Sequence, residues 1–512
     1  MLRLILSVCL VLTCGFPAIA AADEEAGEIE EILVTAHRRE QSAQDAALSL
    51  QVLSGADLDR QGKDGFEDYL LDIPGVSFRD QGSGAKKFAL RGVSNHSGGD
   101  TGGGTVSTAG LYLNDVAIQG SSVMPDLNLY DLNRIEVLKG PQGTLYGEGV
   151  MGGAVRMILN QPDLDEFGYK GDITAETTKD GDMTYRIRGA VNIPLVEGQS
   201  ALRLVGSYKD QGGYIDNITT GASDANTIET YNVRAMLSAQ LSDSVSFELL
   251  AMYDESEFDD FSQIDSTIGD LENSLPEDRN NTSEVSLYAA TLKWDLGFAE
   301  LTSSTSYMEF EREFNLRFPS LEGFFGLFGI PISQQPEYFT VDQSSTAQEF
   351  RLVSNGDGPV DWILGGYYRD RDSDLFATIY LAQNDFETVN AVFGASGLGT
   401  YAHPQIIVSY IDEAYEQYAI YGELNYQLSD QWEATLGARW FDEDVKFSSS
   451  SVGLAPILDV LTNANTGGLS ESDTILRGGL SYRPKDDVLV YFEAAEGFRS
   501  GGVNFQFNLT QS

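Results

Sequence analysis

Cysteine is almost absent from this chain of 512 residues, and its two examples, Cys9 and Cys14, lie near the start. The first twenty residues have the pattern of a secretory signal peptide. Arg3 supplies the positive charge, residues 4–16 are apolar, and residues 18–20 form a small-residue cleavage site. We therefore expect residues 1–20 to be removed on export. The mature chain would then have no cysteine and no disulfide bond.

Basic residues are also scarce, because 32 Lys and Arg stand against 78 Asp and Glu, a net charge of -46. This balance argues against nucleic acid as a partner, since phosphate binding needs clustered Lys and Arg. Histidine occurs only at His37, His96 and His403. These residues do not cluster, and the sequence has no Gly-x-Ser-x-Gly or His-Glu-x-x-His motif. We expect no catalytic residue, no metal site and no cofactor, and so no enzyme.

The mature chain also lacks any stretch of ~20 consecutive apolar residues, the length that a membrane helix needs. From residue 169 onward, however, apolar and polar residues alternate in segments of about ten residues, the length of a membrane-spanning strand. Tyr185 and Ile187 lie on one face of such a segment, and Arg186 and Arg188 on the other. Alternation of this kind is typical of strands with one apolar face, in a membrane barrel or in a soluble sandwich.

The lengths of the connections separate these two possibilities. Short connections, such as residues 196–199 and 484–487, alternate along the chain with long ones. The long connections are expected at residues 211–228, 256–283, 311–344, 371–414 and 443–472. An outer-membrane barrel has tight turns on one rim and long loops on the other, whereas a sandwich has no reason to sort its loops in this way. We therefore predict an antiparallel transmembrane β-barrel at residues 169–512.

Two further regions precede this barrel. Residues 21–45 are acidic and polar, which predicts a flexible arm, interrupted by the β-favouring residues 32–36. Residues 46–162 predict a small mixed α/β domain. Its expected elements are a helix that carries Phe66, Tyr69, Leu70 and Ile73 and ends at Pro74, and strands at 88–90, 110–113 and 134–138.

One stretch carries a family resemblance. Residues 131–147, Asp-Leu-Asn-Arg-Ile-Glu-Val-Leu-Lys-Gly-Pro-Gln-Gly-Thr-Leu-Tyr-Gly, closely resemble the plug signature of TonB-dependent outer-membrane receptors. Residues 70–76 and 90–93 look like two earlier plug motifs, and residues 495–502 are similar to a barrel segment of the same family. Residues 32–36 resemble the TonB box. The chain departs from the pattern at Glu148, where many relatives have a basic or small residue.

The resemblance implies a mainly β fold with a small mixed α/β plug domain inside a barrel of ~22 strands. The sequence has only about 13 segments of the strand type. The chain ends at Ser512 without a terminal aromatic residue. We therefore expect a barrel that is truncated before its C-terminal strands. A smaller barrel that closes in an unusual way is the alternative, because an open edge in lipid leaves backbone groups unpaired.

The resemblance also assigns roles to individual residues. Ile32, Leu33, Val34, Thr35 and Ala36 are expected to bind a TonB-type periplasmic energy-transducing protein by strand addition, the alternative being a first plug strand. Structural roles in the plug are expected for Arg91, Gly92, Arg134, Glu136, Lys139, Gly140, Gly143, Gly147, Gly152 and Gly153. Ligand contacts are expected for His96 and Asp100 near the plug apex, and for Phe324 and Phe325 in an aromatic loop that could equally pack on the barrel rim.

These features predict a receptor for energy-coupled uptake, a monomer in the outer membrane of a Gram-negative bacterium, in contact with lipid and lipopolysaccharide. The expected small-molecule ligand is a ferric siderophore, the commonest substrate of the family, and an oligosaccharide or a vitamin stays open. A passive porin or an adhesin is the alternative of another class, but it would have no use for residues 46–162. A non-functional truncated receptor is the remaining possibility.

Overall fold

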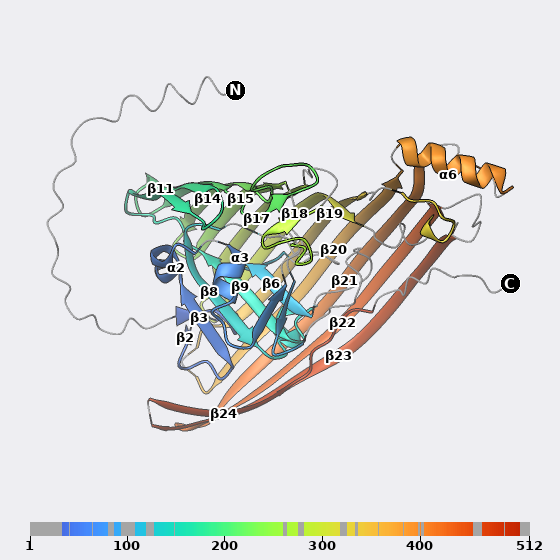
Figure 1. Cartoon of the computed structure of the whole chain (residues 1–512). Coiled ribbons are helices and arrows are strands. Elements are labelled where there is room, and N and C mark those ends of the chain that lie inside the picture. Colours follow the sequence, from blue (N-terminus) through green and yellow to red (C-terminus); the bar gives the residue numbers. More distant parts are fainter. Residues whose placement is uncertain are drawn as a thin grey trace, which may run out of the picture.

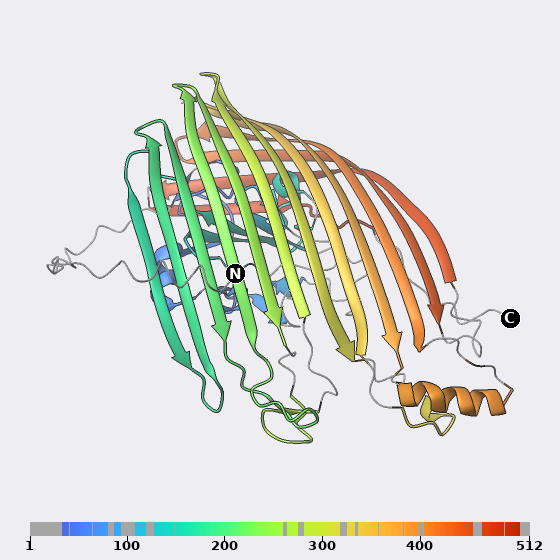
Figure 2. The ribbon, with the colours of Figure 1, turned by 90° about the horizontal axis from the view of Figure 1, so that it is seen from above.

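In the computed structural model of the protein, a wide antiparallel sheet curves around a small inner domain (Figures 1 and 2). The signal peptide, Ile32, His96, Asp100 and Phe324 lie outside the residues that the structure describes. The described residues are 33–39, 41–63, 65–79, 87–93, 108–118, 127, 129–147, 149–259, 264–274, 281–317, 325–332, 336–356, 358–381, 383–397, 400, 404–453, 463–485 and 487–501.

The large sheet, which we call the wall, contains 13 strands and confirms the predicted count. Each wall strand pairs antiparallel with the next wall strand along the chain, and the two outermost strands of the described sheet, β10 and β24, are not paired with each other. The wall strands are β10 (Gly168–Thr177), β11 (Met183–Val196), β12 (Ser200–Gln211), β14 (Ile228–Ser242), β15 (Val245–Phe258), β17 (Asn281–Asp295), β18 (Ala299–Arg317), β19 (Pro336–Ser354), β20 (Val360–Tyr380), β21 (Gln405–Ser429), β22 (Trp432–Gly453), β23 (Asn463–Lys485) and β24 (Val488–Ala495).

The two faces of the wall differ as the alternation predicts. On β11, Arg186 and Arg188 are buried on the concave face, whereas Tyr185 and Ile187 are 48% and 53% exposed on the convex face. A convex apolar face suits contact with lipid, and a concave polar face suits contact with a folded domain or water. The same residue types in the opposite order would turn the apolar side chains toward the lumen.

The outer strands are longer than predicted. Strands β18 to β23 have 19 to 25 residues each. The predicted connections 311–344, 371–414 and 443–472 were therefore too wide, since β18 runs to Arg317 and β19 begins at Pro336. Beyond the apolar band these segments are polar on their convex face, so hydrophobic alternation no longer marks them. Backbone pairing continues all the same, as it does between Asp374 and Asp412.

The inner domain, which we call the plug, is built on a mixed sheet of five strands in the order β3-β8-β9-β6-β7. Its strands are β3 (Leu50–Ser54), β6 (Ala109–Leu113), β7 (Val116–Ala117), β8 (Leu132–Lys139) and β9 (Gly153–Leu159), and a hairpin of β4 (Val76–Arg79) and β5 (Lys87–Leu90) lies beside it. The three strands predicted in this region are confirmed as β5, β6 and β8. Leu111, Ile135 and Val155 are fully buried in the plug core.

The plug helices are short, and the predicted helix was too long. They are α2 (Gly55–Gln61), α3 (Phe66–Leu70) and α4 (Gly143–Tyr146). Helix α3 ends at Leu70, and Ile73 closes a turn by donating its N–H to the Leu70 carbonyl at 3.1 Å. Helix α2 was not predicted, although it has a cap signal: the Ser54 hydroxyl oxygen accepts from the Asp57 N–H at 3.1 Å.

A charge cluster holds the plug to one side of the wall. Asp131 is fully buried in the plug and accepts two hydrogen bonds from Arg203 of β12, at 2.6 and 2.7 Å. Lys170 of β10 lies 3.1 Å from the same carboxylate, and Arg234 of β14 lies 3.7 Å away. Burial raises the pKa of Asp131, but Arg203, Asn160 and Lys170 lower it more, so the carboxyl stays ionised. We call this cluster the Asp131 clamp.

One of the long connections, between β20 and β21, contains a longer helix, α6 (Gln383–Ala395). Among the described residues, no helix has both the length and the apolar character needed to cross a membrane. Helix α6 packs on the connection between β18 and β19, where the Phe325 and Phe393 rings are 5.9 Å apart. Figure 2 shows this helix at the end of the wall, away from the plug.

Candidate functional site

The residues that resemble a TonB box are folded against the plug. Strand β1 (Leu33–Val34) pairs antiparallel with β2 (Gln41–Ser42). Val34 and Ala36 are fully buried, while Leu33 is 45% exposed. The expectation of a flexible arm was therefore wrong for residues 33–39 and 41–45, which we call the box segment. The acidic composition that suggested an arm lies mainly before residue 32.

Polar groups of the plug hold Thr35 on both sides. The Thr35 N–H donates to Glu136 Oε1 at 2.9 Å, and the Thr35 hydroxyl accepts from Arg156 Nη1 at 2.8 Å. The Tyr146 hydroxyl donates to the Ala36 carbonyl at 2.7 Å. The backbone of the box is thus satisfied by plug side chains and by β2, which are the groups that an added strand would have to replace.

Glu136 is the central acceptor of this contact. It is fully buried and pairs with Arg156 at 2.6 Å and with Arg134 at 2.8 Å. Burial raises the pKa of Glu136, but Arg156 and Arg134 lower it more and keep the carboxyl ionised. The predicted structural residues Arg134 and Glu136 therefore form an ion pair with each other, beside Thr35 of the box segment.

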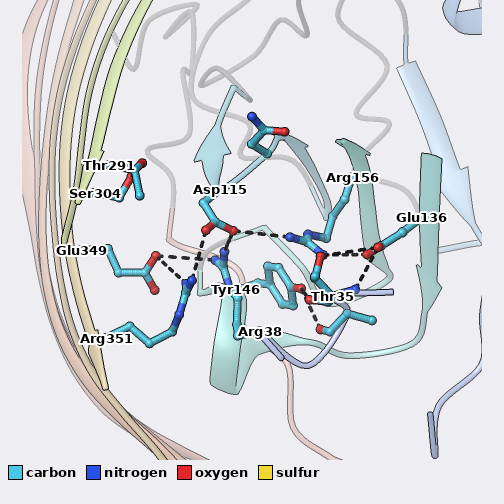
Figure 3. Close-up of polar contacts among 12 residues, drawn as sticks. Thr35, Arg38, Asp115, Glu136, Tyr146, Arg156, Thr291, Ser304, Glu349 and Arg351 are labelled. Carbon is cyan, nitrogen blue, oxygen red and sulfur yellow. Dashed lines mark hydrogen bonds and ion pairs between the residues drawn. The ribbon is translucent and has the colours of Figure 1, made fainter. Parts of the chain in front are cut away.

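Asp115 joins the box segment, the plug and the wall at one carboxylate (Figure 3). It lies in the turn between β6 and β7 and pairs with Arg38 of the box segment. It also lies 3.4 Å from Arg156 of the plug and accepts from Arg351 of the wall at 3.1 Å. Burial opposes ionisation, but Arg351, Arg38 and Arg156 hold the pKa of Asp115 well below its ordinary value.

Two further box residues contact the wall directly. Arg39 Nη1 lies 3.2 Å from the Asp361 carboxylate, and Arg39 Nη2 donates to the Trp362 carbonyl at 2.7 Å. His37 is half-buried, and its Nε2 lies 3.0 Å from Arg477. Burial, and after it Arg477 and Arg39, lower the pKa of His37 to about 3. Because arginine can only donate, this nitrogen of His37 must accept, and the ring is neutral.

A cavity of about 590 Å³ lies beside this network, between the plug and the wall. Arg38 and Asp115 line one side, and Thr291 and Ser304 of the wall line another. Figure 3 shows these two wall residues facing the network. Among the described residues, no group of three or more His, Cys, Asp or Glu is arranged to hold a metal ion.

The remaining plug-signature residues have structural surroundings. Gly147 has a φ of 87°, and a Cβ there would come within 2.8 Å of Arg439. Gly153 has a φ of 138°, and a Cβ there would lie 2.1 Å from the Leu138 carbonyl oxygen. The other members also lie in turns or close contacts: Arg91 donates to Ser49, Lys139 to the Pro74 carbonyl, Gly92 and Gly140 have positive φ, and Gly143 and Gly152 face Ile475 and Val93 closely. This geometry agrees with structural roles for these glycines, which stay a prediction.

Of the ligand-contact candidates, only Phe325 is described. Its ring is fully buried and stacks on Phe393 of α6. It therefore packs within the rim in this conformation, one of the two outcomes expected for the aromatic loop. A ligand contact at Phe325 would need α6 to move, and it stays a prediction.

Sequence reasoning did not find Arg38, Asp115 or Arg156 as site residues. Asp115 is separated from Arg38 by 77 positions and from Arg156 by 41. One local signal existed: Arg156 lies inside the otherwise apolar strand Gly153–Leu159, where a buried charge requires a partner.

Comparison with known proteins decides the family. The family model described as TonB-dependent Receptor Plug Domain matches residues 42–154, and the model described as TonB dependent receptor-like, beta-barrel matches residues 253–511. The chain belongs to the TonB-dependent receptor family. Proteins of this family are outer-membrane β-barrels of Gram-negative bacteria that act with TonB and bind small ligands, and they are not enzymes.

Several relatives resemble the receptor over most of its length. It is 24% identical over 506 residues to a pesticin receptor of Yersinia pestis, an alignment that covers 95% of this chain and 66% of the relative. It is 27% identical over 270 residues to the vitamin B12 transporter BtuB of Photobacterium profundum, which covers 51% of this chain and 41% of the relative. The receptor thus spans about two thirds of the length of the pesticin receptor.

Solved structures show the same fold. The ferric yersiniabactin uptake receptor FyuA of Yersinia pestis matches with a TM-score of 0.71 and 17% identity, covering 88% of this chain and 65% of that one. The siderophore receptor PiuA of Acinetobacter baumannii matches with a TM-score of 0.66 and 14% identity, covering 89% and 65%. At these identities the similarity establishes the plug-in-barrel fold and leaves the ligand open.

Proposed function

We propose that this receptor takes up a ferric siderophore across the outer membrane, with energy from a TonB-type periplasmic protein that binds residues 32–36. The signal peptide expected at residues 1–20 supports export, and the apolar convex face of the wall supports a place in lipid. Similarity to a ferric yersiniabactin uptake receptor and to a siderophore receptor supports the ligand class.

The docking of the box segment is the observation that carries this proposal. The box strand pairs with only two residues of β2, and so short a pairing is easily exchanged for another strand. Further contacts of the box segment reach the plug through Thr35 and Asp115 and the wall through Arg39. A partner that captures the box by strand addition would therefore break the contacts that hold the plug beside the cavity.

The plug argues against a passive pore. It lies on the concave side of the wall and is fixed there by the Asp131 clamp. An open channel would gain nothing from a domain that fills its lumen. Passage past such a domain requires movement, and movement requires work from outside the protein.

A proline in the box tests the energy coupling. Val34→Pro should abolish uptake and leave ligand binding intact, because proline removes the backbone donor that an added strand needs. Uptake and binding are measured with radioactive iron complexed by the siderophores that the same cells secrete under iron limitation. Val34→Ile, which keeps the donor and the β-branched shape, is the control.

Two outcomes would count against the proposal. Undiminished uptake by Val34→Pro would show that residues 32–36 are not the coupling strand. If the receptor bound no iron complex but took up another nutrient in an energy-dependent way, the energy coupling would stand and the ligand would be that nutrient.

A further inference from the structure

One part of the concave face is apolar, whereas the interior of an outer-membrane barrel is usually polar. Eight side chains on β14 to β18 belong to one buried cluster with the plug core, and each is at most 7% exposed. We call six of them the apolar wall: Met236, Leu250, Met252, Leu287, Met308 and Phe310. Tyr288, which follows Leu287, is 51% exposed on the convex face, so both faces of the sheet are apolar here.

The apolar wall is continuous across the strands, and along β18 it is followed by a buried arginine, Arg312. Met252 is the direct partner of Leu287, and Leu287 is the direct partner of Met308. Toward the long connections, the same buried cluster continues to Phe314 and Phe339, whose rings stack 4.8 Å apart. Buried rings therefore continue along the inside of β18, with the Arg312 guanidinium stacked on the Phe314 ring at 3.9 Å.

The other end of the apolar wall opens into the 590 Å³ cavity beside the box segment. Met236 and Leu250 line this cavity together with Val116 of the plug. Val116 directly follows Asp115, the carboxylate that holds Arg38 of the box segment. The turn that covers this end of the apolar wall is thus tied to the box by one ion pair.

The plug is held to the wall by charges on either side of this region. The Asp131 clamp binds β10, β12 and β14, and on the other side the box segment pairs with β20 through Arg39 and Asp361. Separating a buried ion pair leaves a charge without a partner, which is costly. Separating two apolar surfaces is costly only while water replaces them, and the cost is offset when an apolar ligand takes the place of the plug.

We propose that the ligand passes between the plug and the apolar wall, and that its outer surface is mainly apolar or aromatic. This inference rests on the proposed function and deepens it by naming the route and the surface chemistry of the cargo. Withdrawal of Arg38 with the box segment leaves the Asp115 carboxylate held to the wall by Arg351 alone and so loosens the turn at the cavity end of the route. The unbranched side chains of Met236, Met252 and Met308 adapt to a passing ligand at little cost.

Cysteine labelling tests the route, because cysteine occurs in the sequence only at positions 9 and 14. Leu287→Cys places a thiol on the apolar wall, and Met308→Cys is a second position in the same row. Val205→Cys is the matched control, a buried wall residue that packs with Tyr130 next to the Asp131 clamp. Each variant is produced in the cells that make the receptor, with the proton gradient intact or collapsed by a protonophore, and is labelled with N-phenylmaleimide or its sulfonated analogue.

The expected result is severalfold faster labelling of Leu287→Cys and Met308→Cys in energised cells, and no change for Val205→Cys. Adding Val34→Pro should remove the difference. The neutral reagent should also be favoured over the sulfonated one at Leu287→Cys more strongly than at Val205→Cys.

The outcomes separate this inference from the function it rests on. If labelling of Val205→Cys depended on energy and labelling of Leu287→Cys and Met308→Cys did not, the route would be overturned and energy coupling would be kept. No energy dependence at any of the three positions would overturn both. Equal preference for the two reagents at Leu287→Cys and Val205→Cys would overturn the apolar cargo.

Discussion

At the scale of single residues, the strongest feature is that ionised carboxylates hold the box segment in addition to the apolar contacts of Val34 and Ala36. Glu136, which is buried, and Asp115, which is half-buried, stay ionised because arginines from three different parts of the chain surround them. Buried pairs of this kind add little net stability, but the loss of one partner is costly. They are suited to a contact that must be either intact or fully broken.

Replacing Glu136 should release the box. Glu136→Gln leaves Arg134 and Arg156 without their shared partner, at a cost of about 3–5 kcal/mol. Cleavage by trypsin after Arg38, which is 8% exposed, should become faster. Glu166→Gln, on an exposed residue between the plug and the wall, is the control. Equal cleavage rates in the two variants would mean that Glu136 does not hold the box.

Mild acid should also loosen the box through His37. Its pKa is about 3 when docked, against 6.5 for a free side chain, so docking keeps the ring neutral. The released form binds one more proton between these values, and docking is therefore complete above pH 6.5 and weakens as the pH falls toward 3. At pH 5 the loss is about 2 kcal/mol.

The measurement is trypsin cleavage after Arg38 relative to cleavage after the exposed Arg60, compared at pH 7.5 and pH 5. His37→Gln, which cannot titrate, should remove the difference between the two pH values. The depressed pKa of Asp115 adds to the effect only at lower pH, below the ordinary range of an aspartate. A pH response that survives His37→Gln would assign the effect to another group.

At the scale of elements, pattern and motif carried most of the prediction. Alternation on segments such as Tyr185 to Arg188 shows which side chains lie on each face of a strand. It predicted the wall strands, their number and the polar face that meets the plug. The strand ends were missed because acidic residues on the convex face, such as Asp374, end the apolar pattern while backbone pairing goes on. The docked box was missed because its partners, Glu136 and Arg156, lie 101 and 121 positions away from Thr35.

Helix α6 offers a test at this scale. Phe393 is fully buried, stacks on Phe325 and meets Phe328 edge to face at 5.4 Å. Phe393→Ala should destabilise this contact by about 3–5 kcal/mol. Chymotrypsin cleavage after Phe325 should then become faster, whereas Thr388→Ala on the exposed side of α6 should have no effect. Unchanged cleavage in Phe393→Ala would show that other contacts hold the two connections together.

At the scale of the whole molecule, the plug is attached to the wall unevenly. The Asp131 clamp gathers three cations from three wall strands onto one plug carboxylate, while the box segment supplies separable pairs at the other side. A plug that is pulled from the box side would pivot on the clamp. The clamp therefore decides whether the plug and the wall behave as one body.

Removing the clamp charge should uncouple them. Asp131→Asn leaves Arg203, Lys170 and Arg234 facing one another around a neutral side chain, at a cost of about 3–5 kcal/mol. All four tryptophans lie on wall strands, so their fluorescence follows the wall during heating, while trypsin cleavage after Arg156, which is 2% exposed on plug strand β9, follows the plug. The two midpoints should coincide in the native receptor, and the plug midpoint should fall below the wall midpoint in Asp131→Asn. Asp180→Asn, which alters an exposed pair with Lys179, should leave them together. Coincident midpoints in Asp131→Asn would mean that the apolar wall and the ion pairs on the side of the box segment hold the plug to the wall without the clamp.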